Sequence, residues 1–411
     1  MNVRSSNSRN SIFITICVMG SFAILSSTMS KSPVLPNFAD YLQTPSGFWT
    51  GFTFVASTIP GILISLPAGS LSDILGRKRV LLVSSVIFAS APFLYLLIKV
   101  WWQLILVRFY HGFATGMFVP VAQALIAESF PTKRGERISL FSSVTVVGRS
   151  IAPLLGGSIL FATNPGLLPE HYQNFQSLYL AVGVAGLTAF VTALPFLRGT
   201  KDEAKTQAKQ KVSWENIFRQ WRTVARTRGV LLVGLVEASQ YYTYGSVESF
   251  LVKYMLEVAM LNSFLQGIVL AAQLSVVVLS KPLIGRLSDR MGRRTPIILG
   301  CLFSAVPLIA IPFYTEFSVL LILVLIYGLG FSMVTSVTPA LVSDLVSIEV
   351  VGSAMGTMGT LMDVGQTLGP IICGLILVTT FGYRGLFSSL TIILLSTAAI
   401  FSTSNIGGKA R

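Results

Sequence analysis

The chain has 411 residues, of which 53% are hydrophobic and only 11% are charged, against about 25% charged residues in a typical soluble domain. With a mean hydropathy of +0.73, this composition excludes a water-soluble globule and indicates a membrane protein. A formal net charge of +14 would suggest nucleic-acid binding in a polar chain, but the positions of the charges here indicate another cause.

Twelve apolar runs make up most of the chain. Each comes close to the length of about 20 residues that a helix needs to cross the hydrocarbon core of a bilayer. The runs are too long and too uniformly apolar for the strands of a membrane barrel, so we expect helices. In chain order they are Ser11–Val34, Phe48–Ser70, Val80–Ile98, Trp102–Ala127, Ile138–Ala162, Leu178–Leu197, Val230–Val252, Phe264–Leu283, Pro296–Tyr314, Val319–Val342, Gly352–Thr379 and Leu386–Thr403.

The first run follows an arginine-containing segment, as the apolar region of a signal peptide would. It carries no small-residue cleavage pattern and is followed by further spans, so we interpret it as the first membrane span. The cysteines Cys17, Cys301 and Cys373 are scattered through apolar runs, which favours neither a disulfide framework nor a metal site.

Most positive charges lie on one side of the predicted membrane. Of the 30 Lys and Arg residues, 23 fall in alternate loops or in the two tails, and the opposite loops hold few, chiefly Lys99, Lys253 and Arg384. This asymmetry follows the positive-inside rule. It predicts a multi-pass protein of the plasma or inner membrane with both termini in the cytoplasm, and gives no reason to expect a nucleic-acid partner.

A short basic stretch between two runs occurs twice. Gly69–Arg79 and Gly285–Thr295 share the pattern Gly-x-Leu-Ser-Asp-x-x-Gly-Arg-basic and lie 216 positions apart, about half of the chain. We expect each to be a short polar turn, since its glycines permit tight backbone geometry. Self-similarity at half the chain length indicates two copies of one unit.

The repeat extends through the runs that follow. The matching pairs are Gly112 with Gly328, Ala124 with Ala340 and Glu128 with Asp344 at offset 216, then Gly135 with Gly352, Gly148 with Gly365, Pro153 with Pro370 and Gly157 with Gly374 at offset 217. Because six spans return the chain to its starting side, we expect two parallel repeats. The predicted domains are a six-helix bundle at 1–197, a cytoplasmic linker at 198–229 and a second six-helix bundle at 230–411.

The linker has two parts of different character. Lys201–Lys211 is polar and has no apolar periodicity, whereas apolar residues follow helical spacing from Trp214 to Val224, with arginines nearby. The second part fits an amphipathic helix in the cytoplasmic headgroup region. A basic linker that only satisfies topology is an equal alternative.

The repeated basic stretch resembles the loop between the second and third helices of major facilitator superfamily transporters, which recurs between the eighth and ninth helices. This resemblance implies an all-α membrane protein with twelve transmembrane helices in two parallel six-helix repeats. It also implies a secondary transporter that works by alternating access.

In that family, the aspartate of this loop is thought to dock on a helix start in the other half and to latch the outward-open state. Carried over, Asp73 would meet the helix that starts at Gly352, and Asp289 the helix that starts at Ile138. A carboxylate is stabilised at the positive end of a helix.

The expected cytoplasmic latch has four further members. Glu128 and Asp344, at the cytoplasmic ends of the fourth and tenth runs, would receive Arg77 and Arg293. A purely topological role would explain the basic residues of the two loops, but it would not explain the acids.

The fourth run carries Arg108–Phe109–Tyr110–His111–Gly112. An arginine inside a span is costly and indicates a functional site. The Arg-x-x-x-Gly spacing resembles the family's fourth-helix motif, in which the arginine is linked to proton coupling, and His111 stands where the family usually has glutamine. The alternative is that Arg108 extends to the outer interface, close to Trp102.

The fifth run contains Gly148–Arg149–Ser150–Ile151–Ala152–Pro153–Leu154–Leu155–Gly156–Gly157, and the eleventh repeats this pattern from Gly365 to Gly374. Both stretches resemble the antiporter signature of the family, although Ala152 and Cys373 each replace a glycine. Small residues permit close helix packing and proline bends a helix. We therefore expect bend or packing roles for Gly148, Pro153, Gly156, Gly157, Gly365, Gly369, Pro370 and Gly374; ordinary tight packing is the alternative.

Two acids lie inside predicted spans. Asp363 is near the middle of the eleventh run, and Glu237 shares one face of the seventh run with Tyr241 and Tyr244. A low-dielectric environment favours the uncharged form of a carboxyl group, which makes both acids candidate proton carriers. Arg149, near the middle of its own run, would pair with an acid or bind an anionic group.

The leading hypothesis is therefore a monomeric, proton-coupled exporter of small amphipathic or drug-like molecules in the lipid bilayer. The alternative is a facilitator or symporter of a polar or anionic metabolite, which the arginines Arg108 and Arg149 would favour. The sequence has two histidines, no nucleophile motif and no P-loop, so we expect neither an enzyme nor a cofactor.

Overall fold

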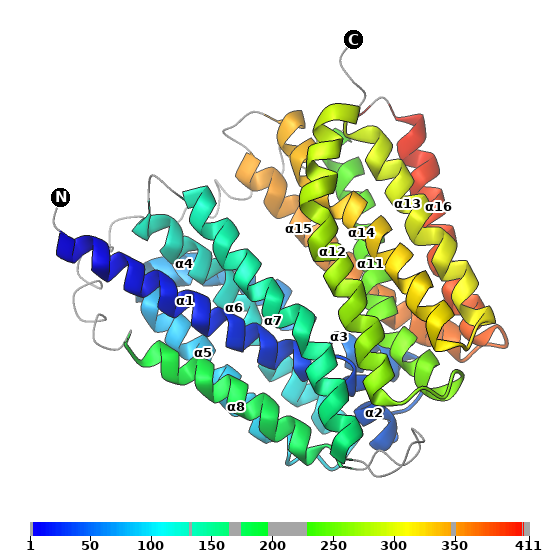
Figure 1. Ribbon diagram of the computed structural model, residues 1–411, viewed down its shortest axis with the longest axis horizontal. Coiled ribbons are helices and arrows are strands. Elements are labelled where there is room, and N and C mark those ends of the chain that lie inside the picture. The colour runs from blue at the N-terminus through cyan, green and yellow to red at the C-terminus, as the bar shows by residue number, and fades with distance from the viewer. Residues whose placement is uncertain are drawn as a thin grey trace. The chain divides into compact units, whose positions relative to one another are not determined.

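The computed structural model describes residues 3–130, 134–163, 174–195, 228–346, 351–404 and 406. Within these ranges the regular structure is helical, without a strand (Figure 1). The helices are α1 (Val3–Met29), α2 (Val34–Tyr41), α3 (Phe48–Val55), α4 (Thr58–Leu75), α5 (Arg77–Tyr95), α6 (Trp101–Ser129), α7 (Arg134–Thr163), α8 (Gln176–Ala193), α11 (Arg228–Glu257), α12 (Ser263–Met291), α13 (Arg294–Ala310), α14 (Phe317–Leu345), α15 (Val351–Leu377) and α16 (Gly382–Thr403).

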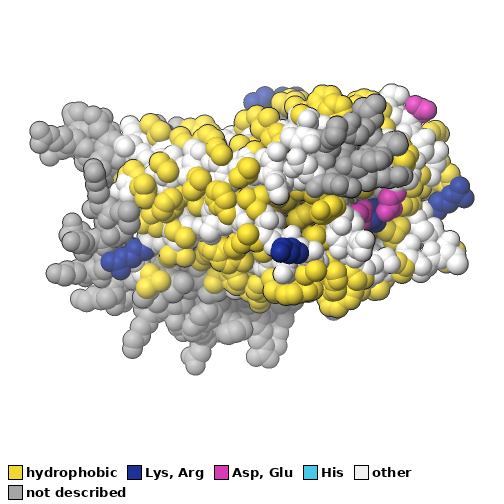
Figure 2. All heavy atoms as spheres, turned by 90° about the horizontal axis from the view of Figure 1, so that it is seen from below, with side chains coloured by type: hydrophobic (Ala, Val, Ile, Leu, Met, Phe, Trp, Pro, Cys, Tyr) yellow, Lys and Arg dark blue, Asp and Glu magenta, His cyan; other side chains and the backbone are white. Residues whose placement is uncertain are grey.

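The helices account for all twelve predicted runs. Among the described residues, 10 helices are long and apolar enough to cross a membrane. The two other predicted runs, 48–70 and 230–252, correspond to α3 with α4 and to α11. Figure 2 shows hydrophobic side chains spread over the face drawn, with few charged ones among them, as expected for a surface in contact with lipid. The predicted all-α membrane fold is confirmed.

Two runs differ from the prediction of one uninterrupted helix each. The first run ends at Met29 and is followed by the separate helix α2, because the ring of Pro33 would clash with the carbonyl of Met29 in a continued helix. The second run is broken between α3 and α4. Pro60 removes the hydrogen bond that the carbonyl of Ala56 would accept, and the chain turns at Ala56 and Ser57.

The repeated basic stretches are less loop-like than predicted. Helices α4 and α12 continue through the first glycine, the serine and the aspartate of each stretch. The turn is confined to the second glycine, Gly76 with φ 95° and Gly292 with φ 88°. Only glycine adopts this backbone geometry without steric strain, and the next helix starts at Arg77 or Arg294.

The chain divides into two compact units. The first comprises residues 1–44 and 56–212, and the second comprises residues 45–55 and 213–411. Helix α3 therefore belongs to the second unit, although α4 belongs to the first. Most of the predicted linker lies outside the described residues, so its amphipathic helix stays a prediction.

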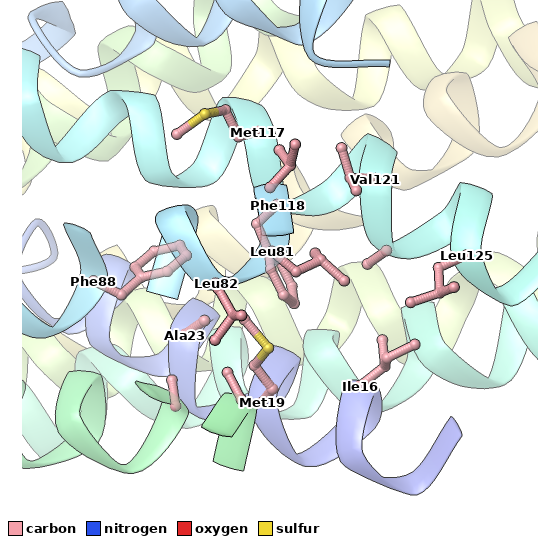
Figure 3. Packing of buried hydrophobic residues seen from close by; sticks show 14 of the residues in the cluster. Ile16, Met19, Ala23, Leu81, Leu82, Phe88, Met117, Phe118, Val121 and Leu125 are labelled. Carbon is pink, nitrogen blue, oxygen red and sulfur yellow. The ribbon is translucent and has the colours of Figure 1, made fainter. Parts of the chain in front are cut away.

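Each unit has its own hydrophobic core. In the first unit, α1, α5 and α6 interlock through buried side chains such as Met19, Leu81 and Phe118 (Figure 3). Helix α8 lies along α1 and α5 (Figure 1). In the second unit, Val233, Val334 and other apolar side chains of α11, α13, α14 and α16 form the corresponding cluster.

Candidate functional site

The interior of the first unit contains a buried arginine. Arg108 of α6 is only 1% exposed, and its Nη2 donates a hydrogen bond of 2.8 Å to Oγ of Ser57. Ser57 lies at the break between α3 and α4. The side chain therefore points into the unit, and the alternative in which it extends to the outer interface is wrong.

His111 lies one helical turn from Arg108 on the same face of α6 and is also buried. Its ring packs edge-on against Phe88, at 5.8 Å between centroids, and against Tyr95, at 6.1 Å. Tyr95 in turn stacks on Tyr179 of α8, with centroids 4.5 Å apart and ring planes within 5°. Nothing in the sequence distinguishes these two tyrosines as site residues, because aromatic residues near a membrane interface are common.

The second unit contains a buried acid. Glu237 of α11 is 3% exposed, and Oγ1 of Thr338, on α14, donates a hydrogen bond of 2.5 Å to its Oε2. The ammonium group of Lys281, on α12, attracts the same carboxylate electrostatically. Glu237 is recognisable from the sequence, but neither of its partners is, because both come from other helices.

The two tyrosines that the sequence placed with Glu237 also face α14. Phe331 packs between them, with its ring centroid 5.3 Å from Tyr241 and 4.9 Å from Tyr244. Both tyrosines are half-buried. The predicted face of α11 thus packs against α14, where Glu237 contacts Thr338 and the two tyrosine rings contact Phe331.

The remaining candidate charges lie on the helices with the antiporter-like signature. Asp363 of α15 is half-buried and Arg149 of α7 is exposed. Asp363 lies two residues before Gly365, which contacts α11. Because two residues span about 200° around a helix, the side chain of Asp363 points away from α11. Asp363 and Glu237 therefore do not face each other across this helix pair.

The glycines of the signature bring helices together in both units. A Cβ atom at Gly365 would lie 2.1 Å from the carbonyl oxygen of Ala238, and one at Gly148 would lie 2.8 Å from that of Ser21. Both contacts are related by the offset of 217 residues, so the repeat extends to packing. Helices α7 and α15 continue through Pro153 and Pro370.

The other glycines of the signature also pack closely against neighbouring backbone or side chains. For Gly374, the partner lies in a segment that the sequence did not suggest. Gly369 lies against the carbonyl of Tyr242, and Gly156 lies against Met29. A Cβ atom at Gly374 would lie 2.3 Å from the carbonyl oxygen of Gly47, in the segment leading into α3. Gly157 is buried in α7.

Each of the two repeated basic stretches holds an arginine between helices. Nη2 of Arg77 lies 2.9 Å from Oε1 of Glu128, and Nε of Arg293 lies 3.2 Å from Oδ2 of Asp344. These are the partners that the sequence paired. Arg293 also forms an ion pair of 2.5 Å with Asp289, in the last turns of α12.

The serines of the two basic stretches, Ser72 in α4 and Ser288 in α12, accept hydrogen bonds from the same arginines. Arg77 donates to Ser72 at 2.5 Å and Arg293 to Ser288 at 2.8 Å. The side chain of Asp73 lies outside the described residues. The docking of Asp73 and Asp289 on helix starts of the other half stays a prediction.

Comparison with known proteins agrees with this arrangement. Residues 12–261 and 233–404 match the family model of the Major Facilitator Superfamily. The chain is 26% identical over 383 residues to the multidrug resistance protein MdtG of Salmonella typhi, covering 91% of this chain and 90% of the relative. It is 26% identical over 366 residues to MdtG of Proteus mirabilis (strain HI4320), covering 86% of each.

Two solved structures share the fold. A bacterial homolog of the human lysosomal transporter Spinster, inward-facing and unoccupied, matches with a TM-score of 0.75 and 14% identity, covering 96% of this chain and 95% of that one. The nucleoside transporter NupG matches with a TM-score of 0.71 and 14% identity, covering 95% and 98%. The chain is a multi-pass membrane protein and belongs to the Major Facilitator Superfamily.

Proposed function

We propose that this chain is a secondary active transporter that exports small amphipathic, drug-like molecules by alternating access, in exchange for protons. Membership of the superfamily supports transport of a small molecule rather than catalysis. The similarity over about nine-tenths of the chain to proteins named for multidrug resistance supports export of drug-like compounds. The charge asymmetry of the loops supports an inner or plasma membrane location with cytoplasmic termini, and we propose that the monomer is the working unit.

The observation that carries proton coupling is the buried carboxyl group of Glu237, hydrogen-bonded to Thr338. A charged side chain at the centre of a membrane helix costs about 2.5–3.5 kcal/mol. Because a proton binding to Glu237 removes this cost and its release restores it, protonation can bias the equilibrium between the conformations of the alternating-access cycle. Asp363 is the second candidate carrier.

In this proposal, Tyr241 and Tyr244 offer aromatic surfaces to the apolar part of the substrate. Their half-buried rings lie four and seven residues after Glu237 on α11, so binding of an amphipathic molecule and titration of the acid would involve one helix. The pairs Arg77–Glu128 and Arg293–Asp344 would stabilise the cytoplasmic ends of their units as parts of the latch.

The test is transport by purified protein in proteoliposomes, with a panel of amphipathic dyes and drugs and an imposed pH gradient. We expect at least one compound to accumulate against its gradient, and a protonophore to abolish the accumulation. Accumulation that is unaffected by collapse of the pH gradient would refute proton-driven export.

The alternative function, a facilitator or symporter of a polar or anionic metabolite, is favoured by one specific observation. Arg108 is buried inside its unit, where a cation is costly unless it serves a function. The same vesicles distinguish the two functions. Exchange of an anionic metabolite at full rate without a pH gradient, with no uptake of amphipathic compounds, would select the alternative.

A further inference from the structure

The interior of the first unit contains polar atoms that its protein contacts leave unsatisfied. Among the described residues, Nε2 of His111 and the hydroxyl oxygens of Tyr95 and Tyr179 are buried and have no hydrogen-bond partner. The three side chains are 3%, 2% and 1% exposed. In native proteins, buried polar atoms nearly always bond to protein or to ordered water.

These atoms belong to one cluster built from three helices. Tyr95 comes from α5, His111 from α6 and Tyr179 from α8. The rings of Tyr95 and Tyr179 stack at 4.5 Å, and the ring of His111 meets Tyr95 at 6.1 Å. The unsatisfied groups therefore belong to neighbouring side chains of one cluster, in which Tyr95 contacts both of the other rings.

Arg108 borders the same region. Its guanidinium group interacts electrostatically with Tyr95, His111 and Tyr179, while its Nη2 is held by Ser57. The hydroxyl of Tyr95 lies close to Arg108 and to Ser30, but it meets the geometric criterion for a hydrogen bond with neither. A small ligand that both donates and accepts hydrogen bonds would satisfy these groups.

We propose that Tyr95, Tyr179 and His111 enclose a water-binding site next to Arg108, in which ordered water bridges the imidazole to the two tyrosine hydroxyls. Water fits this chemistry because each tyrosine hydroxyl can donate or accept, and Nε2 can do either according to the tautomer. A buried water typically makes about three hydrogen bonds to such groups. The site gives His111 a hydrogen-bonded connection to the surroundings of Arg108, and it does not depend on the proposed export function.

Substitutions that remove single hydroxyl groups distinguish a hydrated cluster from a dry one, because the change in Tm should have opposite signs in the two cases. If Tyr95 and Tyr179 bond to water, then Tyr95→Phe and Tyr179→Phe remove a made hydrogen bond and should lower Tm by about 2 °C or more. If the hydroxyls are unsatisfied, the same substitutions remove buried polar groups and should raise Tm or leave it unchanged. Tyr110→Phe calibrates the loss of a known bond, since the hydroxyl of Tyr110 bonds to Ser90 at 2.8 Å.

A second measurement does not depend on the stability of any tyrosine variant. The chain has 2 histidines, so His171→Gln leaves His111 as the single histidine for ¹⁵N-labelled nuclear magnetic resonance. We expect a cross-peak between the ring of His111 and water that persists when chloride is replaced by gluconate.

Three outcomes would overturn the proposal. The first is a Tm that rises or stays unchanged in both tyrosine variants. The second is the absence of a cross-peak between the ring of His111 and water. The third is a cross-peak that appears only when chloride is removed, which would assign the site to a small anion.

Discussion

Thr338 donates a hydrogen bond of 2.5 Å from its hydroxyl group to the carboxylate of Glu237, across the contact between α14 and α11. This bond joins the buried acid of the second unit to a helix far away in the sequence. A carboxyl group that is held in this way can respond to protonation by changing how two helices pack.

Thr338→Val should impair proton-driven transport more than passive exchange. The substitution keeps the shape of the side chain and removes the hydrogen bond to Glu237, a loss of about 1 kcal/mol or roughly five-fold in rate if the bond strengthens during turnover. The measurement is initial rates of uphill and downhill transport in proteoliposomes.

The matched control for this variant is Thr335→Val on the same helix. The hydroxyl of Thr335 bonds only to the backbone carbonyl of Phe331 in the described structure. Equal losses in the two variants would show that the hydrogen bond to Glu237 has no special role.

Gly365→Ala should destabilise the second unit, because its Cβ atom would lie 2.1 Å from the carbonyl oxygen of Ala238. Gly359→Ala on the same helix is the control, since a Cβ atom there meets nothing within 4 Å. An alanine in an open helical position stabilises by about 0.5–1 kcal/mol relative to glycine. Thermal unfolding in detergent should thus show a lower Tm for the first variant and an unchanged or higher Tm for the second. The reverse order would contradict the packing described for α11 and α15.

The sequence predicted the spans and the partners of Arg77 and Arg293, and it did not predict the break between α3 and α4. Apolar length alone indicates a membrane helix, and the repeat of Arg77–Glu128 as Arg293–Asp344 follows from a fixed offset. Proline, by contrast, is common in membrane helices, so Pro60 does not reveal from the sequence whether its helix bends or breaks.

The surroundings of the candidate site could not be derived from the sequence, because they depend on which helices touch. Glu237 was recognisable as an acid inside an apolar run, but its partner Thr338 lies 101 residues away. In the same way, Tyr95 meets His111 and Tyr179 only because α5 packs against both α6 and α8.

The topology prediction concerns the sidedness of two loops. A cysteine introduced at Gln43 and one introduced at Thr206 should react with a membrane-impermeant thiol reagent from opposite sides of the membrane. The positive-inside rule predicts that Thr206 is cytoplasmic. The background protein needs no further change, since Cys17, Cys301 and Cys373 are buried. Labelling of both positions from one side would rule out the twelve-span topology.

Asp73→Asn tests the latch. If the carboxylate stabilises the outward-open state at a helix start, its loss should shift the population toward inward-open and reduce turnover several-fold with little change in substrate affinity. Accessibility of cytoplasmic-side cysteines and the separation of kcat from KM report these two effects. An unchanged turnover, with unchanged accessibility, would leave the loop with a topological role alone.

Transport by the variants Glu237→Gln and Asp363→Asn, made separately and together, shows whether a buried acid carries the coupling proton. Neutralising the essential acid should abolish accumulation against a gradient and leave downhill exchange intact, whereas Glu316→Gln, at an exposed acid before α14, should behave as the wild type. If the double variant still accumulates substrate with the wild-type pH dependence, neither acid is the carrier, and His111 becomes the next candidate.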